Sequence, residues 1–147
     1  MKTTILLLCF LLASFLIMAQ KTPPTAIAQA FAQRFKNIEK VKWNIEEANE
    51  WEAEFKINGK ELSSSFDLSE KWLETETKID KKELPQAIKT ALNKQFADYK
   101  IGESESIESP SFTGYEIALK KKGQEIELRA TIDGKLTIKK QFKEKKD

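Results

Sequence analysis

The chain has 147 residues, 40% of them hydrophobic and 33% charged, which is typical of one modest globular domain or two very small ones. Its 25 basic and 23 acidic residues give a formal net charge of +2, too small to indicate nucleic-acid binding by charge alone. The absence of histidine excludes imidazole general bases, histidine-containing triads and histidine metal sites.

Residues 1–19 have the pattern of a secretory signal peptide. Lys2 precedes an apolar run over residues 5–18, which is shorter than the ~20 residues of a membrane span, and polar residues follow at once. We predict cleavage after Ala19, with a retained N-terminal anchor as the alternative. Cleavage would also remove Cys9, the single cysteine, so that packing alone would stabilise the mature chain.

Two segments led by proline predict amphipathic helices, one starting near Pro24 and one near Pro85. Thr22 is the expected cap of the first helix. In both segments, apolar side chains recur at spacings of three and four and form one face to be buried. These side chains are Ile27, Ala30, Phe31, Phe35 and Ile38 in the first helix, and Ile88, Ala91, Leu92, Phe96 and Tyr99 in the second.

After each helix the apolar period changes from about 3.6 to 2, which indicates antiparallel strands covered on one face. Asn58-Gly59 is a strong hairpin signal between two such strands, and Lys122-Gly123 takes the same place later in the chain. The expected strands are 41–45, 51–57, 62–68 and 73–79 after the first helix, and 101–107, 115–119, 126–132 and 136–142 after the second.

The two halves of the chain resemble each other. Residues 24–35 precede residues 85–96 by 61 positions, and five of the twelve aligned positions are identical. We predict an α+β fold, a tandem repeat of a helix plus a four-stranded antiparallel sheet. The expected boundaries are a signal peptide at 1–19, a first repeat at 20–80 and a second at 81–147, packed in one compact body because a unit of about 60 residues is marginal alone.

A series of weak motifs follows the same order as in a known family. It comprises Val41-Lys42-Trp43, Trp51 to Phe55, the turn from Asp67 to Trp72, and Glu83-Leu84-Pro85. With the signal peptide and the proline-led helix, this order resembles the secreted PepSY-like proteins of Bacteroidetes-type bacteria, whose fold is similar to that of beta-lactamase-inhibitor protein. The resemblance covers about residues 24–140. It implies an envelope or secreted module without an established reaction.

One turn departs from the family pattern. The Asp-Gly-Lys turn of the family is present as Asp133-Gly134-Lys135, but the first half has Ser69-Glu70-Lys71 in its place. Asp67 and Asp133 lie in these strand-end turns, which lack the dense oxygen ligands of a calcium loop. The residues therefore do not predict that both turns bind the same ligand.

The acidic and serine-rich strands suggest no catalytic centre. Glu52 and Glu54 share the outward face of their strand, opposite Trp51, and such alternation predicts solvated carboxylates. The run of serines at residues 63–65 lies inside a strand, without histidine or an SxxK pattern. We predict no catalytic, cofactor-binding or metal-binding residue.

All three tryptophans lie in the first half of the chain. Trp43 and Trp51 sit in the apolar register, which favours core positions beneath the helix. Trp72 is adjacent to Leu73, and one of the two should point away from the helix, so Trp72 is a candidate anchor for a partner on the open sheet face. The candidate partner-binding residues are Trp72, Glu74, Trp43, Trp51 and Tyr115.

Charge is divided between the halves, with 9 basic and 12 acidic residues in 21–80 (net −3) against 15 and 11 in 81–147 (net +4). We predict a periplasmic or secreted, non-enzymatic module. Its open sheet face would recognise a protein or peptide of the cell envelope, for example a hydrolase that it inhibits, and not nucleic acid. After signal cleavage no membrane span remains. The alternative is an envelope sensor of a small ligand or cation, built on the acidic first half and the strand-end turns.

Overall fold

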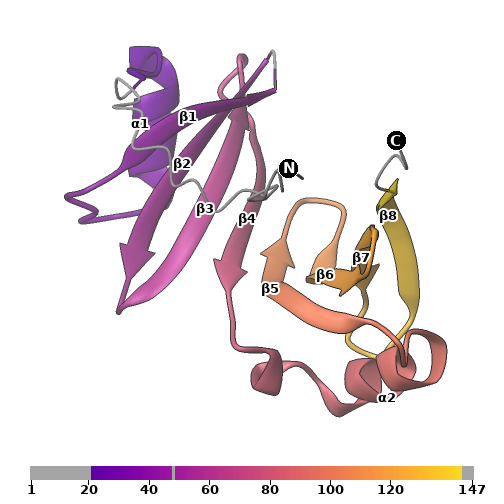
Figure 1. Ribbon diagram of the computed structural model, residues 1–147. Coiled ribbons are helices and arrows are strands. Elements are labelled where there is room, and N and C mark those ends of the chain that lie inside the picture. The colour runs from indigo at the N-terminus through magenta and orange to yellow at the C-terminus, as the bar shows by residue number, and fades with distance from the viewer. Residues whose placement is uncertain (1–20, 48, 144–147) are drawn as a thin grey trace, which may run out of the picture.

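The computed structural model describes residues 21–47 and 49–143, and the predicted signal peptide lies outside this part of the chain. Figure 1 shows the helices lying beside a long, bent sheet. Within the described residues, the elements are α1 (Thr25–Arg34), β1 (Lys42–Glu47), β2 (Glu50–Ile57), β3 (Lys60–Asp67), β4 (Trp72–Lys78), the 3-10 turn η1 (Lys81–Glu83), α2 (Gln86–Gln95), β5 (Lys100–Glu108), β6 (Thr113–Lys121), β7 (Gln124–Ala130) and β8 (Leu136–Lys143).

Both α-helices begin directly after a proline. Pro24 and Pro85 take the N-cap positions, and their carbonyl oxygens accept hydrogen bonds of 3.1 Å from the backbone N–H groups of Ala28 and Lys89. Proline suits a helix start because its fixed φ fits and its missing N–H removes an unpaired donor. Pro24 caps α1 without a side-chain hydrogen bond, so the predicted cap at Thr22 is not formed.

All eight strands of the described residues form one antiparallel sheet in the order β1-β2-β3-β4-β5-β6-β7-β8. The predicted tandem repeat of a helix plus a four-stranded sheet is therefore wrong. The finding that overturns it is the pairing of β4 with β5, which joins the strands on both sides into a single sheet. Two separate sheets would each expose an additional edge of unpaired backbone groups, and this pairing removes both of those edges.

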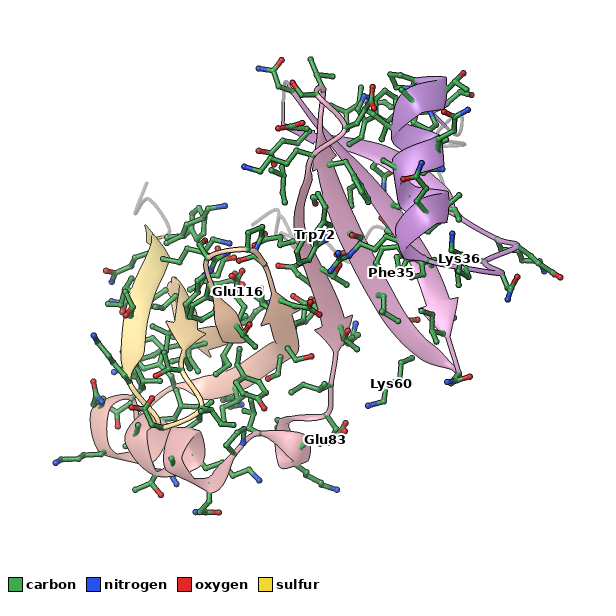
Figure 2. The ribbon with its side chains drawn as sticks, turned by 180° about the vertical axis from the view of Figure 1, so that it is seen from behind. Phe35, Lys36, Lys60, Trp72, Glu83 and Glu116 are labelled. Atoms are coloured by element: carbon green, nitrogen blue, oxygen red, sulfur yellow. The ribbon has the colours of Figure 1, made fainter. Side chains whose placement is uncertain are left out.

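The junction between β4 and β5 is short. It contains four residue pairs, from Thr75 opposite Glu108 to Lys78 opposite Glu105, whereas β2 and β3 share eight. One further backbone bond, 2.9 Å from Ile79 N–H to Ser104 O, extends it. Figure 2 shows Lys60 and Glu83 near each other beside this junction, and their side chains form an exposed ion pair of 3.6 Å.

Both helices pack on the same face of the sheet, as the strand register shows. Cross-strand partners share a face, and Leu62, Thr77, Ser106, Tyr115 and Ala130 form one continuous row across β3 to β7 on the helix side. Two hydrophobic clusters lie beneath the helices. The α1 cluster contains Ile27, Phe31, Trp43, Ala53, Phe55 and Phe66, and the α2 cluster contains Leu84, Ile88, Leu92, Ile117, Leu119, Ile126, Leu128 and Ala130.

The turns that close β3–β4 and β7–β8 use the same backbone hydrogen bonds. Asp67 N–H donates to Lys71 O over 3.0 Å, and Thr131 N–H donates to Lys135 O over 3.1 Å. Each turn contains one residue with positive φ, Glu70 at 66° and Gly134 at 89°. Neither helix of the described residues is long and apolar enough to cross a membrane.

Candidate binding surface on the open sheet face

The sheet face opposite α1 and α2, here called the open face, carries the polar side of every strand. Its residues follow from the register, because Lys42, Glu54, Ser63 and Glu76 form one row and Lys78, Glu105, Glu116 and Arg129 form another. Strand alternation places these side chains away from the helices. A groove of about 1340 Å³ is lined by open-face residues of β1 to β5, by residues 21 and 37–41 that precede β1, and by Trp43, Phe55 and Leu62 of the helix side.

A network of ion pairs occupies the C-terminal part of the open face. Arg129 contacts Glu74 Oε2 at 3.0 Å through Nη2 and Glu116 Oε2 at 3.3 Å through Nε. Lys139 Nζ lies 2.9 Å from Glu116 Oε2 and 3.7 Å from Glu127 Oε1. The network links β4, β6, β7 and β8, and Glu116, labelled in Figure 2, is its buried centre with 7% of its surface exposed.

Electrostatics keeps the central carboxylate of this network ionised. Burial works against ionisation of Glu116, but hydrogen bonds from Glu127, Lys139 and Arg129 outweigh it and lower its pKa. The hydrogen bond with Glu116 in turn raises the pKa of Glu127. Burial also opposes the charge of Lys139, yet its contact with Glu116 raises its pKa overall. The charges of this network therefore satisfy one another.

Two carboxyl groups beside the network have different surroundings. Glu76 on β4 and Glu105 on β5 are half-buried, and within the described residues neither forms an ion pair. Ser63 Oγ donates a 3.3 Å hydrogen bond to Glu76 Oε2. Burial, followed by the charge of Glu105, raises the pKa of Glu76 to about 8. Burial, followed by the charge of Glu103, raises the pKa of Glu105 to about 7.

Four of the five predicted partner-binding residues lie on the helix side of the sheet. Trp43 is buried in the α1 cluster, Trp51 and Trp72 pack against the same cluster, and Tyr115 packs against the α2 cluster. Glu74 alone of the five lies on the open face, where it pairs with Arg129.

Trp72 points to the helix side because β4 contains an irregularity. The register shifts next to Leu73, so that Trp72 pairs with Phe66 while Glu74 pairs with Ser65. Such a bulge breaks the strict alternation from which the sequence-based prediction inferred that either Trp72 or Leu73 points away from the helix. The indole Nε1–H donates to Thr75 Oγ1 over 3.0 Å, and the Arg34 guanidinium of α1 lies 3.4 Å from the ring centroid.

The aspartates of the strand-end turns are engaged in closing their own turns. Asp67 Oδ1 accepts hydrogen bonds from the N–H groups of Ser69, at 2.8 Å, and Lys71, at 3.0 Å. Asp133 accepts one from the Thr131 hydroxyl. Among the described residues, no group of three or more acidic side chains is arranged to hold a metal ion.

Sequence reasoning missed the residues that give the open face its character, namely Glu76, Glu105, Glu116, Arg129 and Lys139. Their alternation along each strand was visible, since Glu74, Glu76 and Lys78 occupy every second position of β4. What the alternation did not reveal was the pairing of β4 with β5, which brings Glu76 and Glu105 together from segments separated by η1 and α2.

Comparison with known proteins supports the predicted resemblance. Residues 49–138 match a family model described as "Putative beta-lactamase-inhibitor-like, PepSY-like". A BLIP-like protein from Bacteroides fragilis aligns over 88% of this chain and 93% of its own, with 23% identity and a TM-score of 0.71. A DUF2874 family protein from Bacteroides ovatus aligns over 84% and 89%, with 19% identity and a TM-score of 0.71.

A protein from Bacteroides eggerthii, described as a "putative periplasmic" protein, aligns over 84% of this chain and 90% of its own, with 17% identity and a TM-score of 0.71. At these identities the similarity shows the fold alone. A search of curated proteins found no significant match.

Proposed function

Because the chain belongs to the beta-lactamase-inhibitor-like, PepSY-like family, we propose that it is a non-enzymatic binding module that works outside the cytoplasm. Its partner is a protein or peptide of the cell envelope, recognised through the open face by complementary shape and charge. A hydrolase that the module inhibits is one partner of this kind.

The observation that carries this proposal is the contrast between the two faces of the sheet. One face is covered by α1 and α2, with both hydrophobic clusters beneath them. On the opposite face, a groove lies across β1 to β5, and Figure 1 shows no helix over it. A sheet face of this kind offers a broad, rigid surface of the type that binds proteins.

The side-chain contacts on the open face favour binding over catalysis. Glu74 and Glu116, two of its acids, are engaged by Arg129 and Lys139, which leaves them poorly suited to proton transfer. On the helix side, the hydroxyl of buried Ser64 contacts Thr75 Oγ1 at 3.0 Å and Glu74 O at 3.1 Å, so it has no general base beside it to activate it as a nucleophile.

A periplasmic or secreted location rests on two separate observations. The first is the apolar N-terminal segment over residues 5–18, which predicts export. The second is the fold shared with the B. eggerthii protein described as periplasmic. Fractionation of cells that produce the protein, with detection of the mature N-terminus by mass spectrometry, tests both the location and the cleavage site.

Site-specific photo-crosslinking tests whether the open face is the binding surface. A photoreactive amino acid at exposed Lys56 or Glu125 would probe the open face, and one at exposed Gln33 or Lys94 would probe α1 and α2. In an envelope extract, we expect the open-face positions to crosslink one specific protein and the helix positions to crosslink none.

The identified protein would then be purified and its dissociation constant measured. Equal crosslinking from the helices would reject the open face as the binding surface. Hydrolase activity that disappears when one open-face carboxyl is neutralised would reject the non-enzymatic role.

A further inference from the structure

The open face is locally acidic on a molecule that is not acidic overall. Seven acidic and five basic side chains line the groove, while the whole chain has a formal net charge of +2. The groove therefore attracts cations although the molecule as a whole does not.

Three of the seven acids that line the groove have a lysine partner. Lys42 Nζ lies 3.1 Å from Glu54 Oε2, Lys56 Nζ lies 3.0 Å from Glu61 Oε1, and Lys78 pairs with Glu103. Glu76 and Glu105 differ from these three, since in the described part of the chain they form no ion pair although they are half-buried. They also lie on neighbouring strands at the junction of β4 and β5.

We propose that the groove binds a basic segment of the partner, with a lysine or arginine side chain between Glu76 and Glu105. This inference rests on the proposed function. A cation in this position replaces the water that the two carboxyls have lost and offsets their mutual repulsion. The resulting charge-assisted hydrogen bonds are the strong kind, and an aliphatic stem can lie against the sheet. Basic segments are the occupants that fit this charge pattern.

Protonation of the same two carboxyls makes such binding depend on pH. The pKa of Glu76 is about 8 and that of Glu105 is about 7, so both are largely neutral at pH 6 and largely charged at pH 8.5. The charged groups that act on Glu76 are Glu74, Glu105, Glu116 and Lys139; those that act on Glu105 are Glu52, Lys78, Glu103 and Glu116. A bound cation favours the deprotonated forms, so affinity should rise with pH across this range.

Isothermal titration calorimetry with an N-acetylated, C-amidated octalysine tests the proposal at low salt. A Gly-Ser octapeptide serves as the neutral control, and blocking the termini removes the titrating α-amino group. For the purified protein, we expect binding at pH 8.5 that is at least tenfold tighter than at pH 6.0. Glu76→Gln/Glu105→Gln should weaken binding at least tenfold at pH 8.5 and abolish its pH dependence.

The matched control is Glu70→Gln/Asp98→Asn, which removes the same charge from exposed positions outside the groove and should bind as the unmodified protein does. Circular dichroism confirms folding of each variant, and the single variants Glu76→Gln and Glu105→Gln replace the double one if it does not fold. The proposal is overturned if octalysine does not bind. It is also overturned if the double variant and its control bind octalysine with equal affinity, or if the affinity does not rise with pH.

The two proposals fail in different ways. Partner crosslinking from Lys56 and Glu125 without octalysine binding retains the open face as the binding surface and rejects the basic segment. Octalysine binding with partner crosslinks only from α1 or α2 rejects the open face as the surface that the partner uses.

Discussion

The two ends of the sheet carry the same arrangement of a helix over strands but are packed with different side chains. At the α1 end the rings of Phe31, Phe55 and Trp43 meet edge to face, with centroids 5.0 Å apart for Phe31–Phe55 and 5.4 Å apart for Phe31–Trp43. The α2 end has an aliphatic cluster around Ile88 and Leu128, both 0% exposed. The comparison teaches that apolar pattern, more than side-chain identity, selects this architecture.

The comparison also raises the question of whether the ends unfold together. They share one sheet but not one hydrophobic cluster, and they meet at a junction of four residue pairs. The ion pair of Arg34 with Glu108, 3.3 Å long, and that of Arg129 with Glu74 connect residues on opposite sides of this junction. Four predictions, from the largest expected effect to the smallest, test the comparison.

The largest effect is expected from Ile88→Ala at the α2 end. Loss of this fully buried side chain leaves a cavity and should lower the free energy of unfolding by about 2–5 kcal/mol. All three tryptophans lie at the α1 end, so their fluorescence reports the other half of the molecule. In urea, we expect fluorescence and far-UV circular dichroism to shift to the same lower midpoint. An unchanged fluorescence midpoint would show that the ends unfold separately.

A smaller loss is expected from Gly134→Ala in the β7–β8 turn. Gly134 has a φ of 89°, and an added Cβ would lie 2.7 Å from the backbone oxygen of Ala87 in α2. Strain and clash together should lower the free energy of unfolding by about 2 kcal/mol. Gly59→Ala is the control at the other end, since its φ is 80° but nothing lies within 4 Å of the added Cβ. Equal losses from the two substitutions in urea unfolding would show that contact with α2 is unimportant.

Glu76→Gln at the junction should change stability as pH rises above 4.5, with the full effect reached above about pH 8. The pKa of Glu76 is raised from 4.5 to about 8, so the native state binds the proton more tightly than the unfolded state. The stability from this group is fully present below pH 4.5 and is lost as pH rises through about 8. Because the side chain is partly exposed, we expect the variant to gain only about 1 kcal/mol at pH 9.

Thermal unfolding at pH 4 and pH 9 measures this difference. Exposed Glu70→Gln provides the comparison, with no gain expected at either pH. A gain for Glu76→Gln that is the same at both pH values would mean that ionisation of the carboxyl is not its cause.

The smallest effect is expected from Glu70→Gly in the β3–β4 turn. Glu70 has a φ of 66°, a conformation that costs a non-glycine residue about 1 kcal/mol, and Gly134 takes this place at the other end of the sheet. After the entropy of the added glycine is subtracted, we expect a gain of about 0.5 kcal/mol in urea unfolding. A loss of stability would show that the Glu70 side chain contributes to the turn.

Local patterns in the sequence predicted the elements but not their assembly. Apolar periods of 3.6 and 2 located both helices and all eight strands, because each depends on neighbouring residues. The predicted helices were too long, since α1 ends before Phe35 and Ile38, and α2 ends before Phe96 and Tyr99. The positive φ angles of Asn58, 51°, and Gly59, 80°, agree with the predicted hairpin turn. The single sheet depends on the pairing of β4 with β5 across η1 and α2, and no local pattern reports such a pairing.

The candidate surface was harder to predict than the fold for a similar reason. The sequence left open whether Trp72 or Leu73 points away from the helix, and the register shift beside Leu73, which no local pattern predicts, places Trp72 on the helix side. Glu74 stays a predicted partner-binding residue on the open face, but the importance of Glu76 depends on Glu105, which reaches it only in the folded sheet. The charge pattern along one strand identifies its solvated face. Whether a carboxyl on that face has an ion-pair partner depends on which strands are its neighbours.

The strand order of the sheet also bears on how the chain folds as it is made. Every strand pairs with the strands next to it in sequence, so each junction can close as soon as its second strand becomes available. Such topology keeps contact order low, which favours rapid folding. A polypeptide that emerges amino end first, from a ribosome or a translocation pore, can therefore add strands to this sheet one at a time. At each step, one growing edge has unpaired backbone groups that must be kept from pairing with other chains.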